Sequence, residues 1–95
     1  VVLHLGLQVK PEAVNDVKGM LIENLPDTRG HDGCQGLDVY DNMDETGNLV
    51  IYERWRSRPQ YEKYLAEPIE TEAMDRLGAW VKTPPGIRYF ERRHV

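Results

Sequence analysis

The sequence predicts a single α+β domain, in which a four-stranded antiparallel sheet carries helices on one face. Apolar residues that alternate with polar ones mark strands at both ends of the chain and in its middle. Apolar residues at three- and four-residue spacing mark helices between these strands. Turns rich in glycine and proline separate the elements in the order strand, helix, strand, strand, helical segment, strand, which is the order of a ferredoxin-like domain.

The first strand and the first helix are predicted within residues 1–25. Leucine and valine recur at every second position from Leu3 to Val9, which is the period of a strand. Pro11 is tolerated in a first helical turn, and apolar residues at helical spacing follow it as far as Leu25. Pro26 should end or kink this helix, because proline has no backbone N–H to donate.

The middle of the chain predicts a β-hairpin. Glycine and aspartate between residues 30 and 33 are typical of a loop, so the chain should turn back there. Residues 34–42 and 48–56 are rich in valine, isoleucine, tyrosine and tryptophan, as strands are. Residues 43–47 between them have the composition of a hairpin turn. The two strands should therefore pair antiparallel.

A helical segment and a last strand complete the predicted domain. Ser57 can cap a helix over residues 58–67, which Pro68 interrupts. A further amphipathic helix is predicted over residues 69–81, and a strand-like alternation returns from Ile87 to His94.

Composition and charge narrow the class of protein. A chain of 95 residues is long enough for one domain over residues 1–95 and too short for two. Its 29% charged and 40% hydrophobic residues are typical of a folded globular protein, and no apolar run is long enough to cross a membrane. A formal net charge of −4 disfavours nucleic acid as a partner. The single cysteine, Cys34, permits no internal disulfide, so we expect a reducing, cytoplasmic location.

Both faces of the predicted sheet carry side chains that favour burial. By alternation, Leu49, Ile51 and Trp55 point to one face, while Val50 and Tyr52 point to the other. The helices can cover only one of these faces. The simplest cover for the second face is another copy of the chain, related by a twofold axis. We therefore expect a homodimer.

Three short segments stand out around the predicted hairpin: Asp32-Gly33-Cys34, then Tyr52-Glu53-Arg54-Trp55, then Ser57-Arg58 with Tyr61. Together they resemble the antibiotic biosynthesis monooxygenase (ABM) domain family, and the resemblance extends over most of the chain. Its most informative part is Glu53 and Trp55 at the end of a strand, with a helix start just after them. The resemblance implies a dimeric α/β barrel, formed by two sheets packed face to face, with a pocket in each subunit between sheet and helices.

The resemblance also implies a chemistry. Characterised relatives oxygenate quinols, phenols or polycyclic aromatics with O2 and without metal or flavin, and one branch degrades haem. Tyr64 stands where many relatives have a helical histidine, and Leu5 stands near the asparagine of the haem-degrading branch. The first hypothesis is therefore a cofactor-independent monooxygenase that acts on an aromatic small molecule. A non-catalytic small-molecule binding or stress-related module, and a haem-degrading enzyme, remain alternatives.

Oxygenation without a cofactor requires a base that removes a proton from the substrate. Glu53 shares a strand face with apolar neighbours, so burial would raise its pKa toward that of a base. The competing interpretation is a structural ion pair with Arg88 or Arg92 on the last strand. His4 is the second candidate for proton transfer; it points to the opposite face and could equally be a packed histidine.

The remaining candidates are substrate contacts. Trp55 and Tyr64 could stack on a flat ring, and Tyr40 and Tyr52 could donate hydrogen bonds to a quinone oxygen, although all four could simply be packing aromatics. Arg88 completes the candidate substrate-binding set. The two soft ligands that flank the 32–33 turn, His31 and Cys34, lack further partners, so no metal site is expected.

Overall fold

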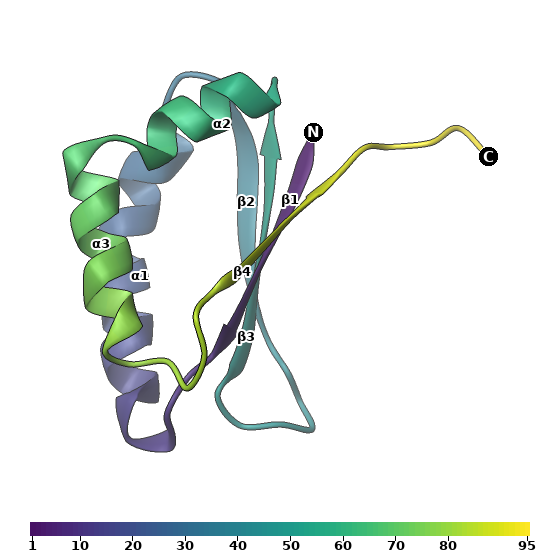
Figure 1. Cartoon of the computed structure of the whole chain (residues 1–95). Helices are drawn as coiled ribbons and strands as arrows, with labels where there is room; N and C mark the ends of the chain where they lie inside the picture. The colour runs from purple at the N-terminus through teal and green to yellow at the C-terminus, as the bar shows by residue number, and fades with distance from the viewer.

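Strands and helices separate into two layers (Figure 1), and the computed structural model describes all residues from Val1 to Val95. The predicted fold class and element order are confirmed. In chain order the elements are β1 (Val2–Gln8), a short 3-10 turn η1 (Pro11–Ala13), α1 (Val14–Arg29), β2 (Cys34–Asp41), β3 (Asn48–Trp55), α2 (Arg58–Leu65), α3 (Pro68–Gly78) and β4 (Gly86–Phe90).

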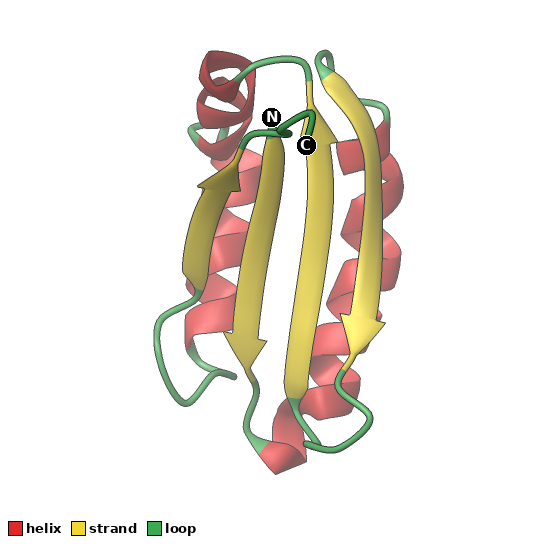
Figure 2. Ribbon diagram, turned by 90° about the vertical axis from the view of Figure 1, so that its right-hand side faces the viewer, coloured by secondary structure: helices red, strands yellow, loops and turns green.

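The four strands form one antiparallel sheet in the order β2-β3-β1-β4. Figure 2 views this sheet from the side that no helix covers, with the helices behind it. At its centre, Leu5 of β1 lies opposite Ile51 of β3 and Ile87 of β4. Side chains of one strand alternate between faces, so this register sends one apolar row from each strand toward the helices.

The hydrophobic core fills the space between the sheet and the helices. Its larger cluster joins the leucines of β1 and β3 to the apolar stripes of α1 and α3, and 13 of its members are buried. A smaller cluster lies at the end of the sheet beneath α2 and consists of Leu3, Trp55, Tyr61 and Tyr64. No helix is both long enough and apolar enough to span a membrane.

Three predicted element ends differ from the structure by three residues or more. The helix predicted over residues 69–81 is α3, which ends at Gly78. The first helix does not end at Pro26 but continues to Arg29, because only one N–H is lost and the Gly30 N–H still bonds to the Pro26 carbonyl at 3.2 Å. The last strand ends at Phe90 rather than His94. Phe90 pairs with Val2, the first residue of β1, so the chain beyond it has no strand to pair with.

The hairpin between β2 and β3 depends on Gly47. The Asn42 side chain accepts a hydrogen bond from the Asp44 N–H at 2.9 Å, which starts the turn. Gly47 has φ +88°, and a Cβ built at this position would lie 2.5 Å from the Val9 carbonyl oxygen. The turn therefore requires a residue without a side chain, because both the dihedral angle and the close approach exclude one.

Replacing this glycine should destabilise the domain. We expect Gly47→Ala to lower the free energy of unfolding by at least ~1 kcal/mol, since alanine is strained at positive φ and collides with the Val9 carbonyl oxygen. Gly19→Ala on α1 is the matched control, because its Cβ would meet no atom within 4 Å and should raise stability by about 0.5–1 kcal/mol. Urea denaturation measures both changes; a Gly47→Ala protein as stable as the parent would contradict this account of the turn.

Candidate functional site

A small cavity lies between the helix-facing side of the sheet and helices α1 and α3. Its volume is about 40 Å³, and ten of its 14 lining residues are hydrophobic. The four that are not hydrophobic are Asn24 and Thr28 of α1, Glu53 of β3 and Glu70 of α3. We call this space the inner cavity. Polar groups that converge in an apolar hollow are the usual arrangement of a small-molecule site.

Glu53 is buried on the apolar face of β3, with 5% of its surface exposed. Its carboxyl group accepts a hydrogen bond from the Trp55 indole N–H at 2.9 Å, and no lysine, arginine or histidine forms an ion pair with it. The predicted ion pair with Arg88 or Arg92 is therefore wrong. Arg88 alternates onto the opposite face of the sheet, and Arg92 lies beyond the end of β4.

Burial raises the pKa of Glu53, because the charged form loses its hydration. The Trp55 hydrogen bond acts in the opposite direction, and the negative charge of Glu70 adds to the elevation. Desolvation also raises the pKa of Glu70, while the hydrogen bond from Tyr64 acts in the opposite direction. Two carboxyl groups with elevated pKa values thus line one cavity, which is the environment expected of proton-transfer groups.

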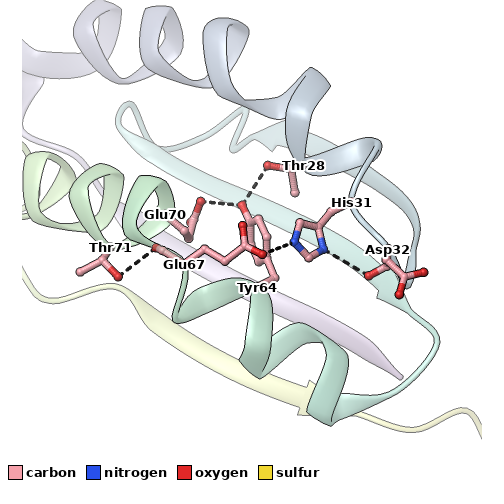
Figure 3. Close-up of polar contacts among 7 residues, drawn as sticks. All are labelled: Thr28, His31, Asp32, Tyr64, Glu67, Glu70 and Thr71. Atoms are coloured by element: carbon pink, nitrogen blue, oxygen red, sulfur yellow. Dashed lines mark hydrogen bonds and ion pairs between the residues drawn. The ribbon is translucent and has the colours of Figure 1, made fainter.

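Three side chains from three helices meet at the edge of the inner cavity (Figure 3). The Tyr64 hydroxyl of α2 donates to the Glu70 carboxylate at 2.5 Å and lies 2.9 Å from the Thr28 hydroxyl of α1. Because the Tyr64 proton is used on Glu70, Thr28 is the donor in the second bond. Burial, and the bond to Glu70, raise the pKa of Tyr64, so the phenol stays neutral.

A second hollow, of about 80 Å³, lies on the other side of this cluster. Asn24, Thr28, Tyr64 and Glu70 line both spaces, so they form the partition between them. We call the second space the outer hollow. Its rim carries Asp27, Ile69 and an ion pair in which His31 Nε2 lies 2.8 Å from Glu67 Oε1.

The ion pair fixes the histidine of the rim. Its hydrogen bond to Glu67 raises the pKa of His31, and a contact of His31 Nδ1 with the Asp32 carbonyl at 3.2 Å acts in the same direction. The Glu67 carboxylate comes from the first residue before α3, so this bond also ties α3 to the loop that follows α1 (Figure 3). The imidazole packs edge-on against Tyr64, with ring centroids 5.0 Å apart.

Trp55 supports the site without lining the inner cavity. The ring is fully buried and packs against Tyr61 and Tyr64 at centroid distances of 5.5 and 5.1 Å. Its indole N–H is the group that reaches Glu53. The residue thus orients the carboxyl group, whereas Tyr64 borders the cavity directly.

The other candidates from the sequence lie on the uncovered face of the sheet. His4 of β1 is flanked by Tyr52 at 5.1 Å and Phe90 at 6.3 Å, and Tyr40 lies 5.8 Å from Tyr52. Arg88 is on the same face, directly opposite His4 in the register. These side chains are separated from Glu53 by the thickness of the sheet. We call the row of His4, Tyr40, Tyr52 and Phe90 the outer aromatic row.

Sequence reasoning missed three of the four partition residues, Asn24, Thr28 and Glu70. For Glu70 and Thr28 the sequence does carry a signal. Each is a polar residue within an apolar helical stripe. Glu70 precedes Ala73 and Leu77 at three- and seven-residue spacing, and Thr28 follows Leu21 by seven residues. A polar residue at a core-facing position of an amphipathic helix is the signal that could have found both.

The fold and this site define an α+β, ferredoxin-like domain with a small cavity, lined by two carboxyl groups, between its sheet and its helices. A family model described as "Antibiotic biosynthesis monooxygenase" matches residues 1–76. The chain belongs to this family. Among individual proteins, Rv0793 of Mycobacterium tuberculosis is 28% identical over 78 residues, which cover 82% of this chain and 76% of that protein.

Solved structures share the fold over nearly the whole chain. The structure of Rv0793 has a TM-score of 0.89 at 23% identity, covering 99% of this chain and 95% of that one. An antibiotic biosynthesis monooxygenase has a TM-score of 0.90 at 19% identity, covering 98% of each chain. A conserved protein from Methanosarcina mazei Go1 has a TM-score of 0.88 at 18% identity, covering 98% and 94%. At these identities the likeness concerns the fold alone.

The two raised carboxyl pKa values predict a dependence of stability on pH. A folded state that binds protons more tightly than the unfolded state loses stability as pH rises, from the unfolded pKa near 4.5 up through the raised folded pKa. Each unit of pKa elevation corresponds to about 1.4 kcal/mol. We therefore expect Glu53→Gln to gain stability relative to the parent as pH rises through this window, with Glu72→Gln, an exposed position, as control. Chemical denaturation between pH 4 and 8 measures the difference, and a constant difference would contradict the raised pKa of Glu53.

Proposed function

We propose that this chain is a cofactor-independent monooxygenase that oxidises a quinol, phenolic or polycyclic aromatic small molecule with O2. Membership of the family supports monooxygenase chemistry. The observation that carries the proposal is Glu53, a carboxyl group buried beside an apolar cavity without a cation. Such a group holds a proton more strongly than a surface glutamate, which brings its pKa closer to neutrality and suits it to a base.

The proposed reaction begins with proton transfer. Glu53 takes a proton from the substrate O–H or activated C–H, and the resulting electron-rich anion donates electrons to O2. In an anthrone, the ring CH2 becomes C=O; one oxygen atom of O2 enters the product and the other leaves as water. The substrate supplies all the electrons, so no flavin or metal is required. Apolar walls keep water from the reactive anion.

The size of the inner cavity restricts how a substrate enters. A cavity of ~150 Å³ accommodates one benzene ring, whereas the inner cavity holds about 40 Å³. An aromatic substrate therefore requires the partition to move, so that the inner cavity joins the outer hollow. Met20 and Met74 line the inner cavity, and flexible thioether side chains can repack around a ligand. In this proposal Tyr64 becomes a substrate contact, and Trp55 acts on the substrate through Glu53.

The small size of the inner cavity favours one alternative, a binding module that holds a small molecule without turning it over. The two carboxyl groups of the cavity could bind a neutral ligand with a hydrogen-bond donor as readily as a substrate. Ligands that raise the thermal midpoint while no product forms would favour this alternative. A haem-degrading enzyme is a weaker alternative, and absence of a Soret shift on haem addition would exclude it.

We also propose that the chain works as a homodimer through the uncovered face of its sheet. Tyr52 and Phe90 are 44% and 46% exposed there, which is high for large aromatic side chains. In this arrangement His4, Tyr40, Tyr52 and Arg88 serve the interface or a substrate that reaches it. We also propose a cytoplasmic location, because the single cysteine, Cys34, is unpaired, as is usual in a reducing compartment.

Substrate oxidation tests the function. Oxygen uptake with a panel of hydroquinones and anthrones should exceed the buffer rate, and Glu53→Gln should lower kcat about a hundredfold, because the base is lost while the shape is kept. Glu72→Gln on the exposed side of α3 should leave kcat unchanged. Uptake equal to buffer across the panel would reject the proposal.

Mass in solution tests the dimer. Light scattering at micromolar concentration should give twice the chain mass of 11.0 kDa, and Tyr52→Glu should shift the protein to the monomer because it places a charge in the interface. Ile22→Glu, at a more exposed position on α1, should remain dimeric. A parent protein of monomer mass would contradict the proposed assembly.

A further inference from the structure

The Glu53 carboxyl group is almost completely buried, so a proton that it accepts needs a route to solvent. Glu53 borders only the inner cavity, and 5% of its surface is exposed. Of the titratable carboxyl groups around the two spaces, Glu70 alone borders both of them. A base that cannot release its proton would work only once, so the exit of the proton is part of the mechanism.

We propose that Glu70, held by Tyr64, carries protons between the inner cavity and the outer hollow and so restores Glu53 after each turnover. This inference rests on the proposed role of Glu53 as proton acceptor. The Glu53 carboxyl loses its proton, the Glu70 carboxylate gains it and then passes it to water in the outer hollow. No group is oxidised or reduced in these steps.

The geometry of the partition suits this role. A cavity of about 40 Å³ has room for a bridging water, with Asn24, Thr28 and the two carboxyl groups as polar partners. The hydrogen bonds between Glu70, Tyr64 and Thr28 can also reverse their donor and acceptor roles. With Glu70 ionised, Thr28 donates to Tyr64 and Tyr64 donates to Glu70. With Glu70 protonated, Glu70 can donate to Tyr64 and Tyr64 to Thr28, while Thr28 donates to the Asn24 carbonyl 3.3 Å away.

Five charged or titratable side chains surround Glu70 in the two spaces. Glu53 faces it from β3, Tyr64 from α2 and Asp27 from α1, while His31 and Glu67 form the ion pair at the rim of the outer hollow. No cation contacts the Glu70 carboxylate directly, so its proton is not displaced by an ion pair. Desolvation raises the pKa of Glu70, as it does that of Glu53, so the pKa values of both carboxyl groups shift in the same direction.

Hydrogen–deuterium exchange at the Glu53 carboxyl tests the route without any substrate. Infrared spectroscopy follows the carbonyl band of protonated Glu53 after transfer to D2O, and Glu53→Gln assigns that band. Glu70→Gln keeps a hydrogen-bond acceptor for Tyr64 but cannot carry a proton, so exchange at Glu53 should slow several-fold. Glu70→Asp should restore part of the rate, and Glu72→Gln, on the exposed side of the same helix, should match the parent. Exchange as fast in Glu70→Gln as in the parent would overturn the proposal.

Turnover gives a second readout that separates this inference from the proposed function. With any substrate that is oxidised, Glu70→Gln should lower kcat ~10- to 100-fold with KM unchanged, and added acetate should recover part of the loss by carrying the proton instead. Tyr64→Phe removes a hydrogen bond from the Glu70 carboxylate, so it raises the pKa of Glu70 and should move the pH profile of kcat upward. If acetate does not restore any of the kcat lost in Glu70→Gln, the proposed role of Glu70 in proton transfer is wrong. If no substrate is oxidised, the proposed function fails, and the exchange rates still decide the role of Glu70.

Discussion

The Glu53 carboxyl lies on the helix-covered face of β3 and receives one hydrogen bond, from the Trp55 indole two residues away. A buried carboxylate is normally paired with a cation, because the loss of hydration is otherwise uncompensated. The Glu53 carboxyl has no such cation, so in the folded state it keeps its proton to a higher pH than a glutamate exposed to water. The proposed base and the need for a proton exit both depend on this burial of Glu53 without a cation.

The sheet divides the aromatic side chains of the protein into two groups with different roles. On the helix side, Trp55, Tyr61 and Tyr64 pack beneath α2 and hold the polar groups of the site in place. On the other side, the outer aromatic row lies open in the single chain, with no helix over it (Figure 2). One layer of backbone thus separates a region suited to chemistry from a region suited to assembly, and a single strand, β3, contributes to both.

Much of the fold could be predicted from local patterns. The strand alternation on β1 and β3, the Ser57 cap and the start of α3 at Pro68 each depend on neighbours in the sequence, and each is found. The end of β4 could not be predicted, because it is set by where β1 begins on the neighbouring strand. Of the partition residues, Tyr64 was predicted as part of the site, but Thr28 and Glu70 were not, because their role depends on how α1, α2 and α3 meet.

Local patterns of two and 3.6 residues were enough to predict the order of strands and helices and the face of each strand on which a side chain lies. They place Glu53 and Trp55 on one face and His4 on the other. They could not show that the Glu53 carboxyl has no cation or that Tyr64 bonds to Glu70, which became visible only in the folded chain. Those outcomes depend on contacts between segments distant in sequence, and the distance between such side chains is set by the packing of layers, not by local periodicity.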